Sequence, residues 1–193
     1  MSIRASAVLA LFTLIGAGAV QSQAAAMPPK PGPEQEKLAY FVGRWAMEGT
    51  MQPGPMGPGG QMTGSETCEW FPGGFHVVCH SKGTGPLGAT HGLGILGYNT
   101  EEKAYTYYGV DNSGYGGQGK GTTDGKTWVY TSEDKMGGKT IYGRYTMSDL
   151  APDSYSFKWE MSEDNKTWNA VMEGKATRAA AKPAEKKEAA PKK

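Results

Sequence analysis

Residues Ser154–Met161 read SYSFKWEM and show most clearly how this chain folds. Its large apolar side chains stand at every second position, and serine, lysine and glutamate stand between them. Side chains of a strand alternate between the two faces of a sheet, so this segment predicts a β-strand with one apolar and one polar face. The same spacing recurs at Trp128 and Tyr130, and at Ile141 and Tyr145.

Segments of this kind follow one another along most of the chain, and turns rich in glycine separate them. They span residues 44–51, 62–70, 75–82, 91–98, 103–110, 115–122, 126–132, 139–147, 154–161 and 167–178. No helical pattern interrupts the series, which excludes a parallel sheet and favours an antiparallel meander. A sheet without covering helices would expose its apolar face, so we expect an all-β, closed barrel of about ten strands.

The first residues are typical of a secretory signal peptide. Arg4 precedes an apolar run, Ala5–Val20, and small residues then offer cleavage sites near Ala24 or Ala26. The run is shorter than the ~20 residues that a membrane-spanning helix needs. We therefore expect residues 1–26 to be removed and the mature protein to be periplasmic or extracellular.

The rest of the chain divides into a linker (27–33), one barrel domain (34–178) and a tail (179–193). A short N-terminal helix is predicted over Pro33–Val42 (PEQEKLAYFV). The tail contains only alanine, lysine, glutamate and proline, so it has nothing to bury and is predicted to be disordered. Without the basic tail and Arg4 the remaining net charge is negative, which argues against nucleic-acid binding.

Both cysteines of the chain lie in residues 68–80, which read CEWFPGGFHVVCH. Cys68 and Cys79 fall on the apolar face of their strands, and an exported protein meets an oxidising compartment. Direct opposition of the two cysteines pairs Trp70 with Val77 and leaves a six-residue loop. A three-residue PGG turn would shift the register and send Cys79 to the other face. We predict a Cys68–Cys79 disulfide and therefore the longer loop.

A tryptophan and an arginine hold inward positions at the two ends of the barrel domain. Trp45 opens the first strand after Gly43, and Arg178 ends the last strand. This arrangement resembles the calycin pattern of lipocalins, in which a G-x-W tryptophan packs against a basic residue of the last strand. The resemblance implies a barrel floor made by Trp45 and Arg178, with a cation–π contact worth ~0.5–2 kcal/mol.

The wider layout resembles an exported bacterial family known only as domain of unknown function 1579, over residues 33–178. The segments that carry the resemblance are FVGRW (41–45), CEWFPGGF (68–75), GLGILGYNTEEKAYTYYGVDNSG (92–114) and VMEGKATR (171–178). The resemblance implies a calycin-like barrel with no agreed activity, and it supplies no catalytic residues.

Several motifs resemble cofactor or metal sites but lack the neighbouring structure that such sites require. GLGILG (92–97) is followed by a turn and a strand, whereas a dinucleotide site needs a helix there. His76 and His80 share one strand face while Cys79 points to the other, so no metal site is expected. Related nitrobindin-like barrels hold haem through a late histidine, and here the last histidine is His91. Four methionines that would suit copper are interpreted as gap fillers: Met47, Met51, Met56 and Met62.

We expect a non-enzymatic barrel that binds a small apolar or aromatic ligand, because no nucleophile motif is present. The residues predicted to line the interior are Trp70, Tyr105, Tyr107, Trp128, Tyr145, Phe157 and Trp159. Glu66 shares their parity and lies either in the interior or at the rim. The alternative is a cell-envelope interaction protein with a filled barrel that acts through its surface and basic tail. A hydrolase or isomerase using an interior glutamate or tyrosine is the third hypothesis.

Overall fold

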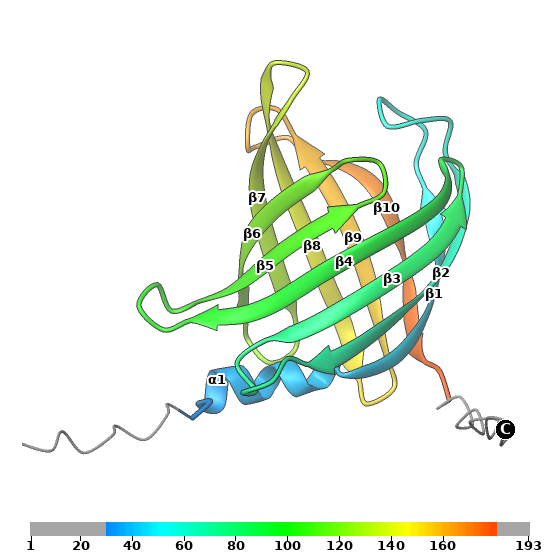
Figure 1. Ribbon diagram of the computed structural model, residues 1–193. Coiled ribbons are helices and arrows are strands. Elements are labelled where there is room, and N and C mark those ends of the chain that lie inside the picture. The colour runs from blue at the N-terminus through cyan, green and yellow to red at the C-terminus, as the bar shows by residue number, and fades with distance from the viewer. Residues whose placement is uncertain (1–29, 181–193) are drawn as a thin grey trace, which may run out of the picture.

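The computed structural model describes residues 30–180 as a single closed β-barrel (Figure 1). The predicted signal peptide, its cleavage positions and nearly all of the predicted tail lie outside the described residues. No helix in the described part of the chain is both long and apolar enough to cross a membrane.

A short helical segment precedes the strands. It consists of the α-helix α1 (Pro33–Glu36) and one 3-10 helix (Lys37–Phe41), where the sequence predicted a single helix. Ten strands follow: β1 (Gly43–Met51), β2 (Gly60–Trp70), β3 (Val77–Gly85), β4 (Gly88–Asn99), β5 (Ala104–Asp111), β6 (Gly116–Thr123), β7 (Trp128–Met136), β8 (Lys139–Ala151), β9 (Ser154–Ser162) and β10 (Asn169–Arg178). The predicted all-β fold of about ten strands is confirmed.

The strands form an antiparallel meander that closes on itself. Each strand pairs with its neighbours in sequence, and β10 pairs with β1 to complete the ring. The pairing leaves no sheet edge along the barrel seam, which removes the surface on which edge strands aggregate. The shortest ladder joins β6 to β7, where registered pairs involve only Lys120–Thr123 of β6.

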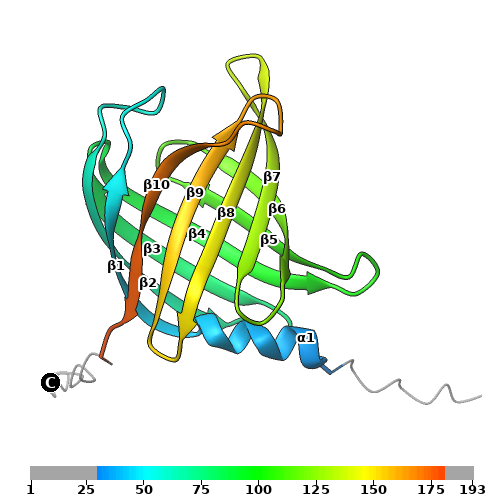
Figure 2. The same ribbon diagram turned by 180° about the vertical axis from the view of Figure 1, so that it is seen from behind.

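The helical segment lies across one end of the barrel, here called the floor (Figures 1 and 2). Leu38 and Phe41 from this segment are buried in the apolar core. The strand residues buried with them include Trp45, Val77 and Tyr155. Burial of a large apolar side chain contributes ~1.5–3 kcal/mol, so packing against this core holds a helix too short to be stable alone. The loops at the opposite end surround what we call the mouth.

Candidate functional site

The cysteine hairpin follows the longer-loop prediction. Cys68 and Cys79 form a disulfide with their Cα atoms 4.0 Å apart, and they stand directly opposite each other in the β2–β3 ladder. Trp70 pairs with Val77, so residues 71–76 form the six-residue loop. The tighter PGG turn is therefore excluded, and both cysteine side chains are buried in the core.

Trp45 and Arg178 meet at the floor, where β1 and β10 close the barrel. The guanidinium carbon of Arg178 lies 4.3 Å from the centroid of the Trp45 ring, and the two residues are paired in register. Arg178 also donates hydrogen bonds to the backbone carbonyls of Pro152, Val42 and Tyr40, at 2.8, 2.8 and 2.7 Å. The arginine thus joins the barrel seam to the helical segment.

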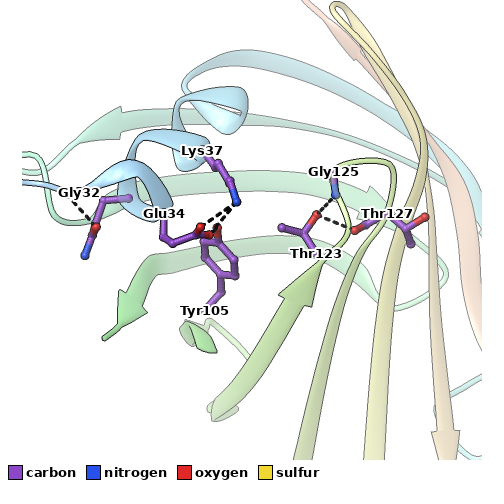
Figure 3. Close-up of polar contacts among 8 residues, drawn as sticks. Gly32, Glu34, Lys37, Tyr105, Thr123, Gly125 and Thr127 are labelled. Atoms are coloured by element: carbon purple, nitrogen blue, oxygen red, sulfur yellow. Dashed lines mark hydrogen bonds and ion pairs between the residues drawn. The ribbon is translucent and has the colours of Figure 1, made fainter. Parts of the chain in front are cut away.

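A second contact fixes the helix to the wall of the barrel (Figure 3). The hydroxyl of Tyr105 donates to Oε2 of Glu34 at 2.5 Å, and Nζ of Lys37 binds the same carboxylate at 2.9 Å. Lys37, and then the Tyr105 hydroxyl, lower the pKa of Glu34. The hydroxyl of Tyr105 is therefore bonded to the helix and does not face the barrel interior.

The residues predicted to line the interior fall into two groups. Tyr105, Trp128 and Phe157 are 2–4% exposed and belong to the packed core near the floor. Trp70 is half-buried and packs against that core. The remaining predicted residues face inward by register and retain accessible surface: Glu66, Tyr107, Tyr145 and Trp159.

Glycines lie beneath some of the inward aromatic rings. A Cβ atom at Gly94 would lie 3.0 Å from the Tyr107 ring, and one at Gly109 would collide with the Tyr107 hydroxyl. The ring of Tyr107 therefore lies against bare backbone of β4 and β5. Gly121 stands in the same way beneath the ring of Tyr130. These glycines therefore let the rings of Tyr107 and Tyr130 lie along the wall.

Tyr107 faces the interior and is only partly buried. The residue is 37% exposed although its backbone pairs place it on the inner face, opposite Leu96 and Gly119. Burial, followed by the charge of Glu66, nevertheless raises the pKa of Tyr107 to about 12. Both properties fit an inward side chain that is desolvated by its neighbours and still retains accessible surface.

Glu66 is the polar residue at the centre of the site. It stands on β2 between Trp45 and Ser81 in the register, and burial raises the pKa of its carboxyl. Burial, and to a smaller extent the charge of Glu66, raises the pKa of Tyr145 and Tyr155, which come from β8 and β9. Within residues 30–180 its carboxyl takes part in no hydrogen bond or ion pair that meets the usual distance criteria, so it is an unpaired acid in the interior.

Tyr130 supplies a second unpaired polar atom, which the sequence analysis did not identify. Its hydroxyl is buried and has no hydrogen-bond partner among the described residues, and burial raises its pKa. The alternation with Trp128 already placed Tyr130 on the inner face. The missing partner depends on which strands lie opposite, and that information is not in the local sequence.

Glu66 and two cysteines form a group of three potential metal ligands. The ligand atoms of Glu66, Cys68 and Cys79 all lie within 4.8 Å of one another. The two sulfur atoms are bonded to each other, and a disulfide lacks the thiolates that bind zinc or copper. His80 stands opposite Thr67 on the outer face and adds no ligand to this group.

Two cavities lie on the outer wall over β4 to β8. One has a volume of about 510 Å³ and is lined by outward residues such as Leu93, Tyr108 and Val110. The other has a volume of about 680 Å³ and extends from Tyr108 to Trp168. They share Tyr108, Gln118 and Glu133, and the last two lie next to the end of the short β6–β7 ladder. Neither is lined by Glu66, so they are distinct from the interior site.

A closed ten-stranded antiparallel barrel, floored by a short helix and an arginine–tryptophan pair, defines a calycin-like barrel protein. The chain belongs to the family of proteins of unknown function DUF1579, whose sequence profile matches residues 30–178. No curated protein matches the chain.

Solved structures share the fold at low sequence identity. A protein of M. tuberculosis, Rv2717c, has a TM-score of 0.55 and 12% identity, and the match covers 77% of this chain and 99% of that one. An S-type phycobiliprotein lyase, CPES from Guillardia theta, has a TM-score of 0.48 and 12% identity over 77% of this chain and 94% of the other. At such identity the first likeness establishes the barrel fold alone.

Proposed function

We propose that the protein is a non-enzymatic binding barrel that holds one small apolar or aromatic ligand in its interior. The observation that carries the proposal is the unpaired carboxyl of Glu66 at an inward position that is half-buried and retains accessible surface. A buried polar group without a partner is costly, and proteins keep one where a ligand completes it. A small barrel has room for one small ligand.

The inner surface suits an aromatic body. Tyr107, Tyr145 and Trp159 offer ring surface from β5, β8 and β9, and apolar contact with such rings supplies most of the affinity in sites of this kind. The carboxyl of Glu66 is the polar group that would set the ligand's orientation. This combination of apolar walls and few polar groups is typical of small-molecule sites.

We further infer that the protein acts after export, in the periplasm or outside the cell. The Cys68–Cys79 disulfide supports an oxidising compartment. Cleavage near Ala24 or Ala26 remains a sequence-based expectation. An intact mass of the protein purified from its native compartment tests it, since retention of residues 1–26 would contradict the proposal.

Binding is tested with N-phenyl-1-naphthylamine (NPN), a neutral apolar dye whose fluorescence rises in an apolar site. Gly109→Val places a side chain where Tyr107 now lies and pushes the ring into the interior. We expect saturable dye binding to the wild type and a loss of at least about tenfold in affinity in this variant. Gly116→Ala is the control, because its Cβ makes only an ordinary 3.7 Å contact with Val110 on the outer face. Equal binding by all three proteins would refute the proposal.

One observation favours the alternative of a surface interaction protein. Tyr108 and Val110 are 50% and 54% exposed and border the outer cavity of about 510 Å³. If this surface acts in place of the interior, Tyr108→Ser should abolish capture of a binding partner while Gly109→Val leaves it unchanged. The reverse pattern would support the binding barrel.

A further inference from the structure

The charges that face the barrel interior are predominantly acidic. Among the registered strand positions of residues 30–180, the inward acidic residues are Glu66 on β2, Asp111 on β5 and Asp134 on β7. The inward basic residues at such positions are Lys139 and Arg178. Whether these two cations neutralise the acids is decided by their own contacts.

Both basic residues are engaged elsewhere. Lys139 stands at the exposed tip of the β7–β8 hairpin, and its Nζ lies 2.9 Å from Oε2 of Glu163. Arg178 lies at the floor, where it stacks on Trp45 and donates to three backbone carbonyls. Neither forms an ion pair with Glu66. The interior therefore contains a carboxyl whose counter-charge the described chain does not provide.

Two of the acids stand near the mouth and have hydrogen-bond partners that hold them in place. Asp111 accepts hydrogen bonds from the backbone and hydroxyl of Ser113, and these bonds lower its pKa and keep it ionised. Asp134 accepts a hydrogen bond from the Ser132 hydroxyl at 2.8 Å. Acids grouped at an entrance raise the local concentration of cations and lower that of anions.

We propose that the ligand is an organic cation: an ammonium group on an apolar or aromatic body, with Glu66 as its counter-ion and the faces of Tyr107 and Tyr145 around it. This inference rests on the proposed function and names the chemical class of its ligand. Electron-rich aromatic faces attract cations, and cages of such rings with an acid are a known means of binding ammonium groups.

A neutral ligand or an anion would compensate the charge of Glu66 less well than a cation. A neutral apolar ligand would remove water from Glu66 and leave the carboxyl without a partner, which is costly. An anion would meet Glu66 at the centre and Asp111 and Asp134 at the mouth, and like charges in one site repel. A cation offsets the desolvation of Glu66 and gains from the aromatic faces at the same time.

The test uses a pair of compounds with the same shape: phenyltrimethylammonium, which is a cation, and tert-butylbenzene, in which carbon replaces the charged nitrogen. Each competes with NPN for the wild type, for Glu66→Gln and for Glu69→Gln. Glu69 is the matched control, since it is the outward acid on the same strand, opposite Val78. We expect Glu66→Gln to lower the affinity for the cation by at least about tenfold and the affinity for tert-butylbenzene by less than about threefold. Glu69→Gln should change neither affinity.

The outcomes separate the two proposals. If the cation binds equally well to wild type and Glu66→Gln, or fails to displace NPN at about 10 mM, the charge inference is overturned. The proposed function then still stands if Gly109→Val abolishes dye binding. If the dye binds all variants alike, including Gly109→Val, both proposals are overturned.

Discussion

Arg178 lies over Trp45 at 4.3 Å and donates from the same guanidinium to the carbonyls of Tyr40 and Val42. One side chain therefore links the last strand, the first strand and the helical segment. A planar group with five donors makes these contacts together, which a lysine ammonium does not.

Replacing this arginine should destabilise the barrel, because its hydrogen bonds to the helical segment and its stacking on Trp45 disappear together. We expect Arg178→Met to lower the free energy of unfolding by about 2–3 kcal/mol and Arg178→Lys by about half as much, since hydrogen bonds from a charged donor are worth ~1.5–3 kcal/mol net. Urea unfolding followed by tryptophan fluorescence measures this. Equal stability of Arg178→Met and the wild type would mean that the seam is held by strand pairing alone.

The disulfide should stabilise the fold without being needed for binding. It closes a short loop, with a sequence separation of 11. Removing such a cross-link costs up to about 3 kcal/mol, chiefly through the greater freedom of the unfolded chain. The Cys68→Ala/Cys79→Ala double variant should therefore unfold at lower urea concentration and still bind NPN. A stable double variant that has lost dye binding would instead assign the cysteines a role in the site.

The contact between Glu34 and Tyr105 should weaken in acid, and the helical segment should then be held less firmly against the barrel. Lys37 and Tyr105 lower the pKa of Glu34, so this contact is present above the ordinary pKa of a glutamate and is lost as pH falls through the lowered value. Because the ion pair is exposed, we expect Glu34→Gln to cost less than about 1 kcal/mol at neutral pH. Hydrogen exchange of the amides of residues 37–41 should be faster in this variant at pH 7. Unchanged exchange would show that Leu38 and Phe41 alone hold the helix.

The ionisation of Glu66 should affect stability in the opposite direction to that of Glu34 as pH changes. Burial raises its pKa in the folded protein, so the folded state holds the proton more tightly than the unfolded state. Stability conferred by this difference is present at low pH and is lost as pH rises from the ordinary glutamate pKa through the raised one. The groups whose pKa values respond to its charge are Tyr107, Tyr145 and Tyr155, which stay neutral over this range.

Glu66→Gln lacks this titration. Thermal unfolding of the ligand-free proteins should show the variant gaining melting temperature relative to the wild type as pH rises from about 4 to about 8. Glu69→Gln, on the outer face of β2, should follow the wild type. A constant difference between Glu66→Gln and the wild type across this range would contradict the raised pKa.

The fold was largely predictable from the sequence because strand alternation is a local property. The apolar face of Ser154–Met161, the number of strands and the register that brings Cys68 opposite Cys79 all follow from side-chain parity. Trp45 and Arg178 were placed together by the calycin resemblance, and they are paired in the structure.

The site was predictable only in part. Parity placed Glu66 and Tyr107 on the inner face, but it does not determine depth, so it does not distinguish these residues from the packed Trp128 and Phe157. The unpaired state of Glu66 and Tyr130 depends on contacts between distant strands. The position of the Tyr107 ring depends on the glycines beneath it, which lie on neighbouring strands and on its own.

The most direct test of the central claim is to locate the bound dye. Intermolecular nuclear Overhauser effects between NPN and the aromatic side chains distinguish the interior from the outer cavities. For an interior site we expect contacts from the dye to the rings of Tyr107, Tyr145 and Trp159, which face inward. Contacts confined to Tyr108 and Val110 would place the ligand on the outer wall and contradict the claim that the barrel interior is the binding site.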